Sequence, residues 1–127
     1  MKLSGKTALI TGSTSGIGLG IARVLAEAGA DILLNGFGDP AAALAEVGQF
    51  GGKVAHHPAD LADVAQLEAL FAFAAREFGG VDILVNNAGI QHVAPVEQFP
   101  VERWDAIIAL NLSAVFLSLI HISEPTR

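Results

Sequence analysis

Short aliphatic runs alternate with helical periodicities along this chain. The runs predict strands at residues 7–11, 31–34, 53–56 and 81–85. Apolar residues then recur three or four positions apart, which predicts helices at residues 17–28, 40–47, 64–78 and 101–112. Because the strands are largely aliphatic, we expect them to be buried on both faces, as in a parallel sheet with helices on each side. The pattern predicts one α/β domain built on a doubly wound parallel sheet.

The turn between the first predicted strand and the first predicted helix is rich in glycine. It consists of Thr11-Gly12-Ser13-Thr14-Ser15-Gly16-Ile17-Gly18, with the spacing G-x-x-x-G-x-G. Glycine permits positive φ and the close approach of a pyrophosphate, and a helix N-terminus offers unpaired N–H donors to an anion. No lysine follows, so the string is not a phosphate loop of the G-K-[ST] type. A glycine-rich turn without a ligand is the alternative that this string alone leaves open.

Two more strings follow later strands. Asp60-Leu61 comes after the third predicted strand, and Asn86-Asn87-Ala88-Gly89 comes after the fourth. Ligands of doubly wound sheets bind beyond the carboxyl ends of the strands, so both strings are candidates for the same site. Taken separately, the first fits an ordinary helix entry and the second fits an ordinary turn.

Together with Asn111 in the last predicted helix, these strings resemble the short-chain dehydrogenase/reductase family in its classical form. The similarity runs from Lys6 to Phe116, and it implies a Rossmann-like sheet of strand order 3-2-1-4, truncated here after about four βα units. It also implies a cofactor site made of Gly12, Ser13, Thr14, Ser15, Gly16, Ile17, Gly18, Phe37, Asp60, Leu61, Asn87, Ala88 and Gly89. Asn111 matches a catalytic asparagine that holds a water in the family's proton relay. Gln91 matches a residue whose amide donates to a substrate carboxylate, with an exposed loop glutamine as the alternative.

Three further stretches are similar to family members that act on a short hydroxy acid, namely residues 35–39, 87–93 and 110–116. The resemblance therefore implies an oxidoreductase with a small-molecule hydroxy acid substrate. It also implies a parent enzyme that forms a homo-oligomer, either a tetramer or a dimer. Two alternatives stay open: a family member acting on a different alcohol or a 3-oxoacyl substrate, and a non-catalytic dinucleotide-binding module.

The choice of cofactor depends on positive charge near the second strand. A 2′-phosphate needs Arg or Lys, and neither residues 13–15 nor residues 35–38 contain one, which favours NAD over NADP. The usual ribose-binding aspartate is missing directly after the second strand, and Asp39 comes a few residues late. His56 and His57 are adjacent on a strand and face opposite sides, so with His92 in a loop they indicate no metal site.

Composition narrows the function further. The chain has 127 residues, a net charge of −6 and no cysteine. The length suits one domain, the charge argues against a nucleic-acid surface, and the lack of cysteine excludes disulfides and thiolate metal sites. We find no targeting segment and no apolar stretch as long as a membrane span. We therefore expect a cytoplasmic protein with no nucleic-acid partner and no membrane partner.

The sequence contains no tyrosine. The resemblance implies a tyrosine that acts as acid/base beside a lysine, in members that are roughly twice this length. We therefore expect no dehydrogenase activity from this polypeptide. Residues 117–127 are similar to a translated sequencing adapter, so we expect residues 1–116 to form the partial NAD-binding domain and the tail to be non-native.

Overall fold

The computed structural model describes residues 2–89 and 101–108. Its strands are β1 (Thr7–Ile10), β2 (Asp31–Asn35), β3 (Val54–His57) and β4 (Ile83–Val85), and its helices are α1 (Gly16–Glu27), α2 (Ala41–Gly48), α3 (Val64–Phe78) and α4 (Val101–Ile108). The strands are parallel and lie in the order β3-β2-β1-β4. The predicted fold class and strand order are confirmed, and the element bounds agree within two residues. The predicted end of the last helix lies outside the described residues.

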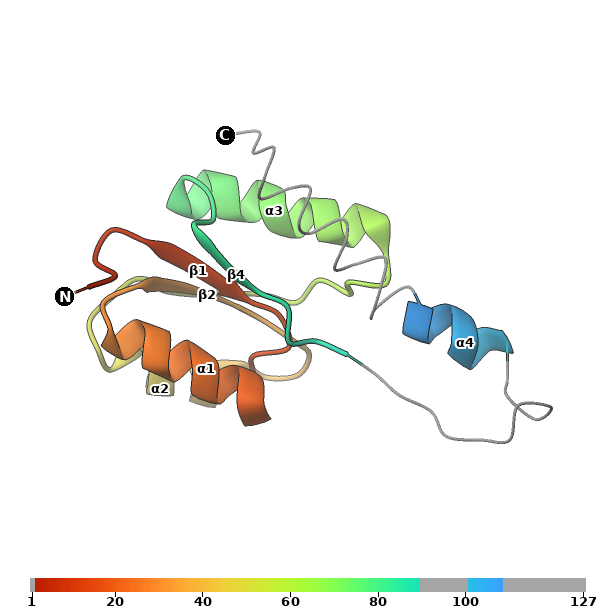
Figure 1. The fold of residues 1–127 in the computed structure, drawn as a ribbon, viewed down its shortest axis with the longest axis horizontal. Coiled ribbons are helices and arrows are strands. Elements are labelled where there is room, and N and C mark those ends of the chain that lie inside the picture. The colour runs from red at the N-terminus through yellow and green to blue at the C-terminus, as the bar shows by residue number, and fades with distance from the viewer. Residues whose placement is uncertain (1, 90–100, 109–127) are drawn as a thin grey trace.

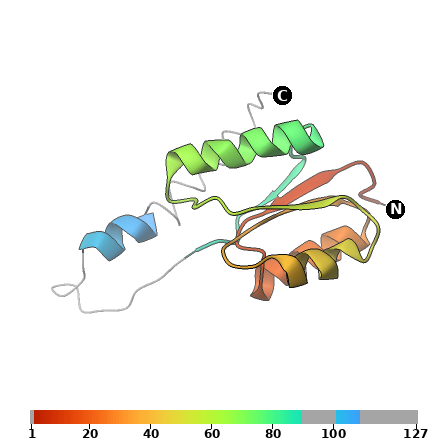
Figure 2. The same ribbon diagram turned by 180° about the vertical axis from the view of Figure 1, so that it is seen from behind.

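Helices cover both faces of the sheet. In Figures 1 and 2, α1 and α2 lie on one face and α3 lies on the other. Successive side chains of β1 point to opposite faces and divide the core in the same way. Ala8 and Ile10 pack in a cluster with residues of α1 and α2, whereas Leu9 packs in a cluster with residues of α3. The two central strands are therefore buried on both sides, as their aliphatic sequences predict.

The helix ends next to the sheet's carboxyl edge follow local sequence signals. Asp63 begins α3, and its side chain accepts from the backbone N–H groups of Ala65 and Gln66, as predicted for a capping aspartate. Helix α1 begins after Ser15, whose side chain makes no capping hydrogen bond. The N–H groups in the first turn of α1 are therefore not capped by that side chain, although they point toward the edge where the strands end.

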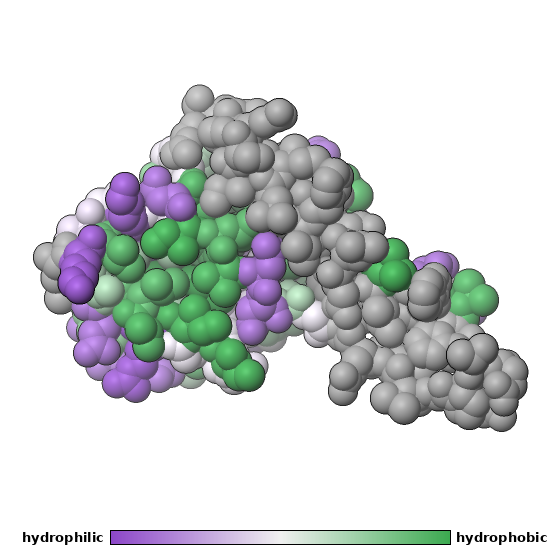
Figure 3. Space-filling model, viewed as in Figure 1, coloured by the Kyte–Doolittle hydropathy of each residue, from purple (hydrophilic) through white to green (hydrophobic). Residues whose placement is uncertain are grey.

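The outer strands are less covered than the central ones. Both β3 and β4 are only partly buried, and within the described residues β4 pairs with β1 alone. Apolar side chains gather on the face of the molecule that carries α1 and β4 (Figure 3). On α1, the side chains of Ile17 and Val24 are 78% and 65% exposed. None of the helices in the described ranges combines the length and apolarity needed to cross a membrane.

Candidate functional site

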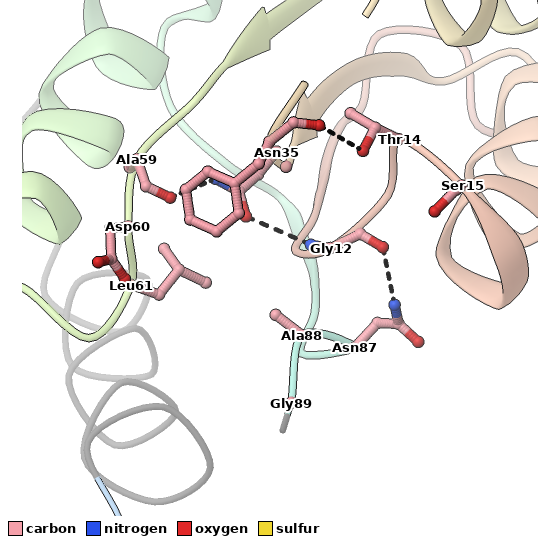
Figure 4. A pocket seen from close by; sticks show the side chains of 12 residues that line it. Gly12, Thr14, Ser15, Asn35, Ala59, Asp60, Leu61, Asn87, Ala88 and Gly89 are labelled. Atoms are coloured by element: carbon pink, nitrogen blue, oxygen red, sulfur yellow. Dashed lines mark hydrogen bonds between the residues drawn. The ribbon is translucent and has the colours of Figure 1, made fainter. Parts of the chain in front are cut away.

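A pocket of about 420 Å³ lies at the carboxyl ends of the strands. Figure 4 shows it from close by. It is lined by Gly12, Thr14, Ser15, Asn35, Gly36, Phe37, Ala59, Asp60, Leu61, Asn87, Ala88 and Gly89. These residues come from the ends of all four strands or from the loops that follow them. The fold thus brings the three predicted strings together, at the edge where doubly wound domains bind ligands.

The glycine turn after β1 is tied to the end of β4. Thr11 Oγ1 accepts hydrogen bonds from the backbone N–H groups of Asn87 and Ala88, each at 3.0 Å. The side-chain amide of Asn87 donates to the carbonyl oxygen of Gly12 at 3.0 Å (Figure 4). Gly18 packs against this bond, because a Cβ at Gly18 would lie 2.6 Å from Asn87 Nδ2 and closer still to the Gly12 oxygen. The turn and the segment after β4 therefore form one packed unit.

Asn35, the last residue of β2, ties the same turn to β3. Its Oδ1 accepts from the backbone N–H of Gly12 at 3.3 Å. Its Nδ2 donates to the carbonyl oxygens of His57 and Ala59, both at 3.1 Å. The residue is only 2% exposed, so these partners satisfy an amide that has little access to water. One side chain thus connects the ends of three neighbouring strands.

Ser13 belongs to the predicted cofactor loop but does not line the pocket. Its side chain is fully buried, and its Oγ donates to the carbonyl oxygen of Ile10 at 2.6 Å. Ser13 Oγ also accepts a hydrogen bond from the backbone N–H of Asn35 at 3.0 Å. Ser13 therefore holds the turn from inside the protein.

The other predicted site residues fall into three groups. Those in the pocket wall are Gly12, Thr14, Ser15, Phe37, Asp60, Leu61, Asn87, Ala88 and Gly89. Those in the first turn of α1, next to the wall, are Gly16, Ile17 and Gly18. Gln91 and Asn111 lie outside the described residues.

Sequence reasoning missed several wall residues and one that supports the wall. Gly36 leaves room for its neighbour, since a Cβ there would lie 2.5 Å from Thr14 Oγ1. Asn35 and Ala59 line the pocket, and Thr11 Oγ1 accepts a hydrogen bond from the loop after β4. A usable signal existed for the two polar ones: Thr11 and Asn35 each follow an aliphatic run directly, where a buried polar group needs a partner.

The pocket wall carries almost no charge. Among the wall residues that the structure describes, Asp60 is the only ionisable one, and neither Lys nor Arg is present. The Asp60 carboxylate accepts from the backbone N–H of Ala62 at 3.0 Å, and its own N–H donates to Gln66 Oε1 at 2.8 Å. Asp39 is not part of the wall; it accepts from the N–H of Ala41 at the start of α2. Most side chains in the wall are thus small, apolar or amides.

His57 contacts Ala59, a residue of the pocket wall, and Phe73 of α3. Its Nδ1 accepts from the backbone N–H of Ala59 at 3.2 Å, and its ring packs on Phe73 of α3 with centroids 5.2 Å apart. Burial lowers the pKa of His57, and the neighbouring His56 and Arg76 lower it further. The ring of His56 bonds instead to a carbonyl group of the turn after β2. In the described part of the chain, no three His, Asp or Glu side chains group as metal ligands.

Known proteins share the sequence pattern that forms this pocket. The family model for short chain dehydrogenases matches residues 6–124. The chain belongs to the short-chain dehydrogenase family. Members of this family are oxidoreductases that bind a nicotinamide dinucleotide.

Individual relatives are similar over most of this chain. It is 61% identical over 116 residues to the D-beta-hydroxybutyrate dehydrogenase of Cupriavidus necator, which covers 90% of this chain and 45% of that protein. It is 58% identical over 126 residues to the D-beta-hydroxybutyrate dehydrogenase of Rhizobium meliloti, covering 96% and 49%. A crystal structure of a metagenomic short-chain oxidoreductase in complex with NADP is 34% identical, with a TM-score of 0.91 over 97% of this chain and 57% of that one. The chain spans about half the length of the curated relatives it matches.

Proposed function

We propose that this chain is the cofactor-binding half of an NAD-dependent D-3-hydroxybutyrate dehydrogenase. The parent enzyme interconverts D-3-hydroxybutyrate and acetoacetate by hydride transfer. The observation that carries this proposal is that the glycine turn, Asp60-Leu61 and the Asn-Ala-Gly segment line one pocket together. The identities of 61% and 58% to two D-beta-hydroxybutyrate dehydrogenases support the substrate.

The wall of the pocket fits a dinucleotide. We place the pyrophosphate against Gly12 and the first turn of α1, where Ser15 leaves the backbone N–H groups uncapped. We place adenine between Phe37, which is 69% exposed, and Asp60-Leu61 across the pocket. The segment 87–89 then receives the nicotinamide side. When bound, NAD supplies the acceptor of the hydride.

The same wall favours NAD over NADP. A 2′-phosphate brings additional negative charge, and a cation must offset it. Within residues 2–89 and 101–108, no Lys or Arg lines the pocket, and the one ionisable group in its wall, Asp60, carries the same sign as the phosphate. The NADP complex of a 34% identical oxidoreductase makes NADP the competing candidate, so both cofactors belong in the test.

The chemistry needs groups beyond this pocket. We propose that Gln91 donates its amide to the substrate carboxylate and that Asn111 holds a water of the proton relay. The polypeptide itself has no tyrosine to take the alcohol proton, so we propose that it binds cofactor without turning over substrate. We further propose that residues 1–116 form the native domain, that the parent is a homo-oligomer, and that it is a cytoplasmic enzyme.

The decisive experiment compares this chain with an extended chain. The extended chain joins residues 1–116 to the remaining C-terminal part of the Cupriavidus necator relative. NADH absorbance with D-3-hydroxybutyrate is followed for both, and we expect turnover from the extended chain only. The variant Gln91→Leu in the extended chain should raise the KM for D-3-hydroxybutyrate and leave the KM for NAD unchanged. Cofactor binding without any turnover in the extended chain would instead support a non-catalytic dinucleotide-binding module.

A further inference from the structure

We propose that Asn35 is a positioning residue that sets the adenosine half of the pocket. This inference rests on the proposed nucleotide-binding function. Asn35 occupies the end of β2, the place from which a ribose-binding carboxylate would be expected, yet its amide is hydrogen-bonded to the protein backbone. It faces the protein and holds two parts of the pocket wall at a fixed separation.

The hydrogen bonds of Asn35 reach the two sides of the adenosine region. On one side, its Oδ1 accepts from the N–H of Gly12 in the glycine turn at 3.3 Å. On the other, its Nδ2 donates at 3.1 Å to the carbonyl oxygen of His57 and at 3.1 Å to that of Ala59. Ala59 directly precedes Asp60-Leu61, which line the far side of the pocket. The distance between the turn and this far wall therefore depends on one amide group.

Only an amide supplies this combination of one acceptor and two donors. The variant Asn35→Asp keeps an acceptor for the Gly12 N–H but turns a carboxylate oxygen toward two carbonyl oxygens. Repulsion between these oxygens should push residues 57–59 away from the turn while the carboxylate is charged. Protonation restores a donor toward one of the two carbonyls, so the defect should be reversed by acid.

The control sits at the other end of the same strand. Asp31 begins β2, and its Oδ1 accepts from the backbone N–H of Lys53 just before β3 at 2.9 Å. Asp31→Ala removes a link between the same two segments of the sheet, at the edge opposite the pocket. Because this bond is exposed and the Asn35 amide is buried, Asp31→Ala should lower stability less than an Asn35 variant, and it should leave nucleotide affinity unchanged.

The experiment measures the Kd of the 127-residue chain for NAD, for AMP and for nicotinamide mononucleotide across a pH series. Asn35→Ala should weaken NAD and AMP about tenfold, a loss of about 1.4 kcal/mol, and leave nicotinamide mononucleotide unchanged. Asn35→Asp should show the same loss at neutral pH and recover AMP binding as the pH falls. Because this recovery is measured within one variant, it stays informative even where Asn35→Ala fails to fold.

The outcomes separate the two proposals. A wild-type chain that binds none of the three nucleotides overturns the proposed function, and the role of Asn35 falls with it. A wild-type chain that binds, together with Asn35 variants of unchanged AMP affinity, overturns the role of Asn35 alone. Equal losses for AMP and nicotinamide mononucleotide, or an AMP loss in Asp31→Ala, would show a general structural effect and would also overturn it.

Discussion

Replacing Gly18 by alanine tests whether the glycine turn and the end of β4 form one unit. The added Cβ would lie 2.6 Å from Asn87 Nδ2 and closer still to the carbonyl oxygen of Gly12, the two groups that hydrogen-bond to each other across the site. Real Cβ atoms essentially never approach that closely, so the start of α1, the turn or the asparagine must shift, and we expect their hydrogen bond to be disturbed. The substitution acts on the packing of the site while changing no charge.

The expected cost follows from three contributions. Overpacking a close-packed contact costs about 1–3 kcal/mol, and losing the hydrogen bond adds about 1 kcal/mol. Alanine in a helix recovers about 0.5–1 kcal/mol relative to glycine. The matched control is Gly20→Ala in the same helix, where a Cβ meets nothing within 4 Å, so only the helix gain applies. We expect Gly18→Ala to be less stable than Gly20→Ala by roughly 2–4 kcal/mol.

Urea unfolding followed by circular dichroism, with NAD titration of each folded variant, measures this difference. Gly20→Ala should unfold at a slightly higher urea concentration than the wild type and bind NAD equally well. Gly18→Ala should unfold at a clearly lower concentration. It should also bind NAD more weakly, since the turn against which we propose the pyrophosphate binds is disturbed. Equal unfolding midpoints for the two variants would refute the packing argument.

Four further predictions concern the titration of His57, the choice between NAD and NADP, association of the chain at β4, and catalysis. Because burial, His56 and Arg76 lower the pKa of His57 below 6.5, the fold favours its neutral form. The free energy of unfolding should therefore fall as the pH drops from 6.5 through the lowered pKa. The variant His57→Asn keeps an acceptor for the Ala59 N–H but does not titrate, so it should flatten this dependence in urea unfolding. Calorimetry should give tighter binding of NAD than of NADP, and equal affinities would contradict the charge argument. Within the described residues β4 pairs with β1 alone, so the 127-residue chain should associate in light scattering through the other edge of β4, whereas the extended chain should not show association through this edge. Finally, the 127-residue chain should produce no NADH above a buffer blank with D-3-hydroxybutyrate.

The fold was predictable because its signals are local. The aliphatic runs of β1 and β2 indicate burial on both faces, and Asp63 marks a helix start through a hydrogen bond within its own turn. For Thr11 and Asn35 the sequence indicates only that each needs a partner; it does not indicate which one, because the partners follow other strands. Ser13 shows the same limit, since nothing in a run of three small polar residues indicates which one points inward.

The groups that form the pocket are present in this chain, whereas the tyrosine expected as acid/base is not. The hydrogen bonds that shape the pocket run between the ends of β1, β2, β3 and β4, from Thr11 to Asn87 and from Asn35 to Gly12 and Ala59. All of these groups lie within residues 2–89, the first of the two ranges that the structure describes. A positioned acid/base typically supplies about 10²–10⁴-fold of an enzymatic rate. Among the described residues of the wall only Asp60 is ionisable, and its carboxylate already accepts the backbone N–H of Ala62. We therefore expect the pocket to bind a dinucleotide, and we expect the acid/base to be the tyrosine that the family resemblance implies and that this chain does not contain.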